Sequence, residues 1–159
     1  MGLNYQRAFD IAALRIIEQG QPSHDTSGLC RYRVFQPDRE LRCAIGWLIP
    51  DYRYQAWFED HAGGDLDQVA RRGIAPELGF DPSRDDVTFL NALRFAHDAS
   101  SNALRYGDCR TFLAEYIRRM HAVAKRYDLD PCCLERRRVE PSSSHHGQYV
   151  FAGMFDDDQ

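Results

Sequence analysis

The stretch "DDVTFLNALRFAHDASSNAL", residues 85–104, and the stretch "DCRTFLAEYIRRMHAVAKRYDL", residues 108–129, decide the fold. Apolar side chains recur in both at the 3.6-residue spacing of an amphipathic helix. The stripe of the first holds Leu90, Leu93, Ala96, His97 and Leu104, and that of the second Phe112, Leu113, Tyr116, Ile117, Met120, Val123, Ala124 and Tyr127. We expect Asp108 to be the N-cap of the second helix, and the "YGD" connection is short enough to force an antiparallel helix pair.

A further amphipathic helix is predicted near the start of the chain, over "NYQRAFDIAALRIIEQ", residues 4–19. Gly20 and Pro22 follow the last periodic residue, and these residue types typically end a helix. This helix brings another apolar face to the pair formed by residues 85–104 and 108–129.

The segment between these helices predicts a small β-hairpin from residues 30 to 43. "CRYRVFQ", residues 30–36, alternates and is rich in strand-forming residues, "PDRE" is typical of a turn, and "LRCAI" can return. The chain can then turn helical after Ala44 and must stop before Pro50. We expect Asp51 to cap a short helix that carries Tyr54, Trp57 and Phe58.

Together these elements predict one mostly α domain, α+β at the margin, with four to five helices and a small hairpin. We expect the compact domain to span residues 1–130. Residues 131–159 read as a polar tail that carries one apolar segment, "YVFAGMF", residues 149–155, able to dock on this molecule or on another. Because this segment can dock on a second copy of the chain, a homodimer is a further possibility.

Composition is that of a soluble globular protein: 159 residues, of which 43% are hydrophobic and 28% charged. The formal net charge of −4 argues against a phosphate-dominated nucleic-acid binder, since such domains present a basic field. No apolar run approaches the ~20 residues that a membrane-spanning helix needs. Five cysteines without a secretory pattern at the N-terminus indicate reduced thiols and a cytoplasmic location.

Cys43, His97 and Asp98 are the candidate catalytic residues. A Cys–His hydrolase or deamidase needs a thiolate, a nearby base and a group that orients the base. The alternative interpretation is structural, because Cys43 lies in an apolar run and His97 shares the stripe of Leu90 and Leu93. Buried cysteines and core histidines with satisfied ring nitrogens are the commoner outcome.

No metal site and no cofactor are predicted. The chain contains no C-x-x-C, no H-E-x-x-H, no Walker A motif and no G-x-G-x-x-G after a strand.

An aromatic cluster and the tail are the candidate binding surfaces. Trp, Tyr and Arg are the residue types that dominate protein–protein hot spots. The candidate partner-binding residues are Tyr52, Arg53, Trp57, Arg136, Arg137, Tyr149 and Phe151. A place in the core is the competing interpretation for the aromatic residues of the 51–60 segment.

The strings "CRYR" (30–33), "CAIGWLIPDYRY" (43–54) and "LRFAHD" (93–98) resemble a scattered group of small phage, prophage and bacterial proteins. The matching positions are Cys30, Tyr32, Arg33, Cys43, Gly46, Pro50, Asp51, Tyr54, His97 and Asp98. The resemblance indicates the kind of organism and protein, and it implies no particular chemical reaction. It implies a non-enzymatic phage or prophage accessory protein that binds and inhibits a host protein, for instance a defence component, in the bacterial cytoplasm. The rival is the cysteine-dependent hydrolase or deamidase.

Overall fold

The computed structural model describes residues 2–61, 65–74, 81–105 and 108–135 of the chain. This part of the chain is mostly helical, with four α-helices and one two-stranded antiparallel hairpin in a single small domain. The fold class predicted from the sequence is therefore confirmed. Among the described helices, none has the length and the apolar character to cross a membrane.

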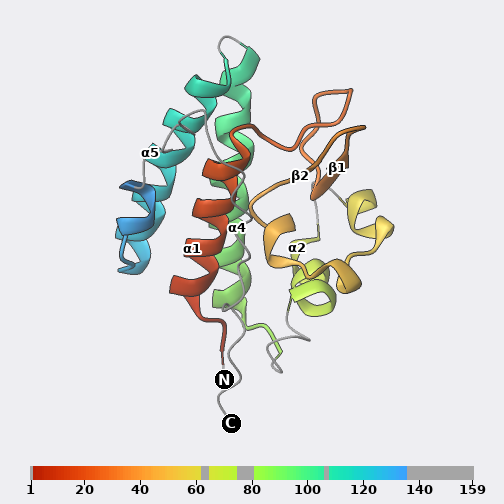
Figure 1. The fold of residues 1–159 in the computed structure, drawn as a ribbon. Coiled ribbons are helices and arrows are strands. Elements are labelled where there is room, and N and C mark those ends of the chain that lie inside the picture. Colours follow the sequence, from red (N-terminus) through yellow and green to blue (C-terminus); the bar gives the residue numbers. More distant parts are fainter. Residues whose placement is uncertain (1, 62–64, 75–80, 106–107, 136–159) are drawn as a thin grey trace, which may run out of the picture.

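Three long helices form the main layer (Figure 1). They are α1 (Tyr5–Gln19), α4 (Arg84–Ser101) and α5 (Cys109–Tyr127). Helix α1 starts at Asn4, whose side chain accepts from the Arg7 backbone N–H, and ends at Gly20 in the left-handed conformation that glycine tolerates. Helices α4 and α5 start at Ser83 and at Asp108, the predicted N-cap of α5. The spacing of the apolar residues thus places all three helices correctly.

Aromatic contacts fasten the three helices to one another. The rings of Tyr5 and Phe89 stack with centroids 4.2 Å apart, and Tyr127 meets both rings edge-on. Deeper in the core, the Tyr116 hydroxyl donates to the Ala12 carbonyl at 3.0 Å. A buried tyrosine needs such a partner, because an unpaired hydroxyl in an apolar interior costs free energy. These contacts join α1, α4 and α5 into one core.

The hairpin and a series of short turns lie beside α1 and α4 (Figure 1). Strand β1 (Arg33–Phe35) pairs with β2 (Glu40–Arg42), with Val34 opposite Leu41. Three 3-10 turns follow, at Gly46–Leu48, Asp51–Arg53 and Ala56–His61, and then the short helix α2 (Leu66–Val69) and a π-helical turn over Ala70–Ile74. This half of the domain carries the "CAIG" stretch.

Of the two predictions made for this half, the hairpin is confirmed and the helix after Asp51 is wrong. The hairpin within residues 30–43 is confirmed, although its paired strands are shorter than the pattern suggests. The prediction of one helix that Asp51 caps and that carries Tyr54, Trp57 and Phe58 is wrong. Two 3-10 turns take its place, and Asp51 is the first residue of the first turn, whose N-cap is Pro50. The Asp51 carboxylate accepts from Arg42 and pairs with Arg33 instead.

The packed part of the chain extends past α5. A 3-10 turn at Cys132–Glu135 contacts α1 and α5, and it buries Cys133 and Leu134. The predicted tail is residues 131–159; its remaining part, residues 136–159, contains the apolar segment and lies outside the described residues.

Candidate functional site

Cys43 lies in the interior at the junction of the hairpin and the first 3-10 turn. Its side chain is only 3% exposed. Its backbone N–H donates to the Tyr32 carbonyl at 3.1 Å, and its sulfur accepts from the Gly46 N–H at 3.3 Å. The thiol therefore fills space and helps to close the turn, as the structural interpretation of this residue expects.

The surroundings of Cys43 oppose thiolate formation. Burial, followed by the negative charge of Asp98, raises the pKa of the Cys43 thiol far above its usual value. A catalytic cysteine requires a lowered pKa and an open approach. The cavity that Cys43 shares with Cys30, Tyr32 and Arg94 has a volume of about 10 Å³. That is room for about one water molecule, whereas ligand sites occupy about 300–1,000 Å³.

His97 is fully buried on α4, and both of its ring nitrogens are engaged. The Ser23 backbone N–H donates to Nε2 at 3.2 Å, and Nδ1 lies 2.9 Å from an Asp98 carboxylate oxygen. Because Nε2 accepts, the proton of the neutral ring belongs on Nδ1, from which it is donated to Asp98. No lone pair of His97 is left to act as a general base.

Cys30, which the sequence indicates only as part of the resemblance, joins His97 and Asp98 in one cluster. One ligand-type atom from each of the three residues lies within 4.8 Å of the others. The Cys30 sulfur lies 3.2 Å from the Ser101 hydroxyl, and burial, followed by Asp98, raises the pKa of this thiol to about 12.

The same tautomer argument decides whether this cluster suits a metal ion. Ligation through Nδ1 would move the ring proton to Nε2, where it would face the Ser23 N–H. Ligation through Nε2 would displace that N–H from its acceptor. The arrangement therefore fits a structural role, in which hydrogen bonds hold the segment from Ser23 to Cys30 against α4.

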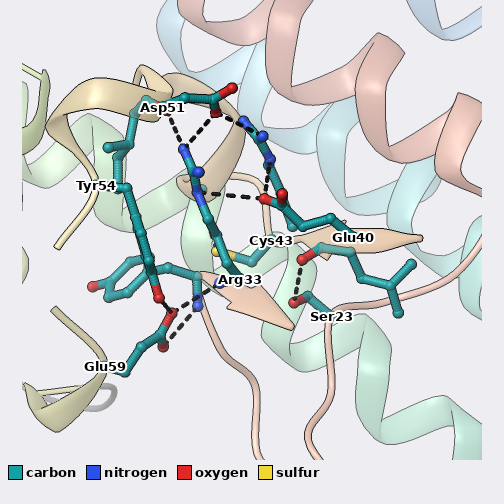
Figure 2. Close-up of polar contacts among 12 residues, drawn as sticks. Ser23, Arg33, Glu40, Cys43, Asp51, Tyr54 and Glu59 are labelled. Atoms are coloured by element: carbon teal, nitrogen blue, oxygen red, sulfur yellow. Dashed lines mark hydrogen bonds and ion pairs between the residues drawn. The ribbon is translucent and has the colours of Figure 1, made fainter. Parts of the chain in front are cut away.

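A second polar network surrounds Arg33, whose side chain is buried (Figure 2). Its Nη2 donates to the Ile49 carbonyl at 2.8 Å and lies 3.1 Å from Asp51. Its Nε lies 3.6 Å from Glu40, and its guanidinium carbon lies 4.4 Å from the centroid of the Tyr54 ring. A buried charge is tolerated only with such partners. Arg33 thus joins the hairpin to the turns after Pro50.

Glu59 closes this network from the third 3-10 turn (Figure 2). Its carboxylate accepts from the Tyr32 and Arg33 backbone N–H groups at 3.1 and 2.9 Å. It also accepts from the Tyr54 hydroxyl at 2.9 Å. Sequence analysis missed Glu59, since no local pattern links it to a strand 26 positions away.

Gly46 sits where two backbone segments meet. A Cβ atom at this position would lie 2.0 Å from the Tyr32 carbonyl oxygen. Together with Arg33, Cys43, Asp51 and Tyr54, this glycine accounts for much of the "CRYR…CAIGWLIPDYRY" pattern. These residues have structural roles in joining the hairpin to the turns.

The predicted binding residues differ in how much surface they present. Tyr52 is 73% exposed, and the Arg53 guanidinium lies 5.7 Å from the centre of its ring. Trp57 is half-buried and packs edge-on against Phe58, so part of its ring belongs to the core. The predicted tail residues Arg136, Arg137, Tyr149 and Phe151 lie outside the described residues.

Phe35 is an exposed aromatic residue that sequence analysis did not select. It is 68% exposed at the end of β1, and its ring meets Tyr54 edge-on at 6.4 Å. Strand alternation gives no signal for this exposure, because it places Phe35 on the same face as Arg33, whose side chain is buried. We define the hairpin surface as Phe35, Tyr52, Arg53 and Tyr54.

Comparison with known proteins adds no family: no family model matches the chain, and neither do curated proteins or solved structures. The resemblance drawn from the sequence strings therefore stays a prediction.

Proposed function

We propose that this protein is a non-enzymatic phage or prophage accessory protein that binds and inhibits a protein of its bacterial host, for instance a defence component. The class of partner comes from the resemblance of the sequence strings. The mode of action, binding without chemistry, is supported by the geometry around the candidate residues.

The observation that carries the proposal is the exposure of two large aromatic side chains, Phe35 and Tyr52. They stand on two elements that the Arg33–Asp51 ion pair connects. Exposed aromatic residues with a neighbouring arginine are typical of binding hot spots. The hydrogen bonds and ion pairs beneath them support an arranged surface, which lowers the conformational cost of binding. The hairpin surface is therefore our candidate for contact with the host protein.

The rival function, a cysteine hydrolase or deamidase, would use Cys43 as nucleophile and His97 as base. It needs an accessible thiolate and an available imidazole nitrogen. Cys43 is buried in a cavity of about 10 Å³, and Ser23 and Asp98 engage both nitrogens of His97. We therefore favour binding.

The test is capture of a partner from a lysate of a bacterial host by the full chain, followed by binding titrations with the purified partner. We expect Phe35→Ala and Tyr52→Ala each to weaken binding by about tenfold or more, the usual effect at a hot spot. Phe95→Ala is the matched control, because Phe95 is also exposed but lies on α4. Equal binding by all three variants would reject the hairpin surface, and failure of the wild type to retain any specific partner would reject the function.

A further inference from the structure

A groove lies between α4 and α5, on residues that the proposed host contact does not use. Its volume is about 350 Å³. Its apolar lining includes Ala92, Phe95, Ala122 and Val123. Phe95 is 62% exposed, and the Arg119 guanidinium lies 5.6 Å from the centre of its ring. The groove thus offers an aromatic anchor beside a cation.

The charged lining of this groove is entirely basic. Among the residues that the structure describes, the charged residues that line it are Arg118, Arg119 and Arg126, and none of its lining residues carries a carboxylate. Glu115 forms ion pairs with Arg118 and Arg119, and Arg126 forms no ion pair within the described residues. The groove therefore suits an occupant that combines apolar side chains with several carboxylates.

We propose that the groove binds a segment of the same chain, "YVFAGMFDDD", residues 149–158. This segment supplies three aromatic side chains, Tyr149, Phe151 and Phe155, and then three carboxylates in succession. The aromatic residues match Phe95 and its apolar neighbours, and the carboxylates match the three arginines. The proposal gives Tyr149 and Phe151 an intramolecular contact in place of the partner contact predicted from the sequence.

The length of chain before the segment permits this contact. The turn at Cys132–Glu135 packs on α5, so the link starts beside the helix that carries the arginines. Residues 136–148 number 13 and can span about 43 Å when extended. Helix α5 has 19 residues and is about 28 Å long. Every point along the groove is therefore within reach.

The experiment places the photo-crosslinker p-benzoylphenylalanine at position 95 of the full chain. After irradiation of a dilute sample, trypsin releases residues 139–159 as one peptide, because this stretch contains no Lys or Arg. We expect mass spectrometry to find that peptide joined to residues 95–105 within one chain. The same crosslinker at the exposed Tyr52 is the matched control, and it should not capture the 139–159 peptide.

Charge swaps test the ionic part of the contact. Converting Asp156, Asp157 and Asp158 to Lys, after which trypsin releases residues 139–156 in place of 139–159, should lower the crosslink yield about fivefold or more. Adding Arg118→Glu and Arg126→Glu should restore part of the yield. Equal yields from positions 95 and 52, no crosslink to the peptide, or crosslinks only between two chains would each overturn the proposal. None of these results depends on the hairpin surface, so they leave the proposed function to its own test.

Discussion

At the scale of single residues, Gly46 shows how tightly the hairpin and the turns approach each other. A Cβ atom there would lie 2.0 Å from the Tyr32 carbonyl oxygen, and that oxygen already accepts from the Cys43 N–H. Backbone atoms cannot move aside as a flexible side chain can. We therefore expect Gly46→Ala to lower the free energy of unfolding by about 3 kcal/mol or more, the upper range for overpacking.

The matched control for this substitution is Gly2→Ala, because nothing lies within 4 Å of a Cβ atom at Gly2. Its effect should stay within about 0.5 kcal/mol. Urea unfolding of the three proteins measures both values. Equal stability of Gly46→Ala and the wild type would show that the two backbone segments do not meet as described.

Single residues also show where sequence reasoning succeeds and where it stops. The position of His97 in an apolar stripe is enough to predict burial, and the structure confirms it. The partner of its Nε2 comes from Ser23, which is 74 positions away, and no local pattern contains that information. The burial of Cys43 was one of two open interpretations, and only its neighbours from other elements decide between them.

At the scale of elements, the carboxylate of Glu59 holds the hairpin to the third 3-10 turn. It accepts from two backbone N–H groups and one hydroxyl. In Glu59→Gln, an NH2 group replaces one of these acceptor oxygens and leaves donors facing donors. We expect a loss of about 1–3 kcal/mol in the free energy of unfolding, the cost of unsatisfied buried groups.

Glu18→Gln is the control for this prediction, since Glu18 is exposed and pairs with Arg15 on the surface of α1. Glu18→Gln should change the free energy of unfolding by less than about 1 kcal/mol. If Glu59→Gln destabilises the protein no more than Glu18→Gln does in thermal or urea unfolding, the network around Arg33 does not hold the two elements together.

Helix α5 carries an ion pair whose effect depends on pH. Hydrogen bonding from Arg118, with a further contribution from Arg119, lowers the pKa of Glu115 from 4.5 to about 2. Because the folded pKa is lowered, the pair stabilises the protein above about pH 4.5, and this stabilisation is lost as the pH falls toward 2.

We therefore expect wild type to exceed Glu115→Gln in stability by less than about 1 kcal/mol at neutral pH, a value typical of partly exposed pairs. The difference should shrink as the pH is lowered through this range, as followed by urea unfolding at each pH. A difference that does not change with pH would contradict the lowered pKa.

The length of an element decides whether it can be predicted from the sequence. Helices α1, α4 and α5 each have at least 15 residues, so the apolar period is repeated several times and can be read from the sequence. The turns between Gly46 and His61 are each six residues or fewer. No period can be established over such lengths, and the carboxylate of Asp51 is used by two arginines from the hairpin instead of by a cap.

At the scale of the whole molecule, the three-helix layer supports a second half made of the hairpin and short turns (Figure 1). Of the residues that suggested catalysis, Cys43 lies between the hairpin and the first 3-10 turn, and His97 and Asp98 lie on α4, where His97 contacts Ser23. The exposed aromatic residues Phe35 and Tyr52 lie on the outside of the second half. Our account is that Cys43 and His97 maintain the fold and that recognition uses the surface. The reactivity of the five cysteines can test this arrangement, because the cysteines are spread over both halves.

The most direct measurement is the rate of iodoacetamide alkylation at each cysteine of the folded chain, followed by mass spectrometry, with the urea-unfolded protein as reference. Cys109 and Cys132 are exposed and should be labelled, whereas Cys43 and Cys133 are buried and should react only after unfolding. Burial also raises the pKa of the thiols of Cys43 and Cys133, which slows their reaction further. Labelling of Cys43 in the folded protein as fast as that of Cys109 would contradict the account and favour the enzyme.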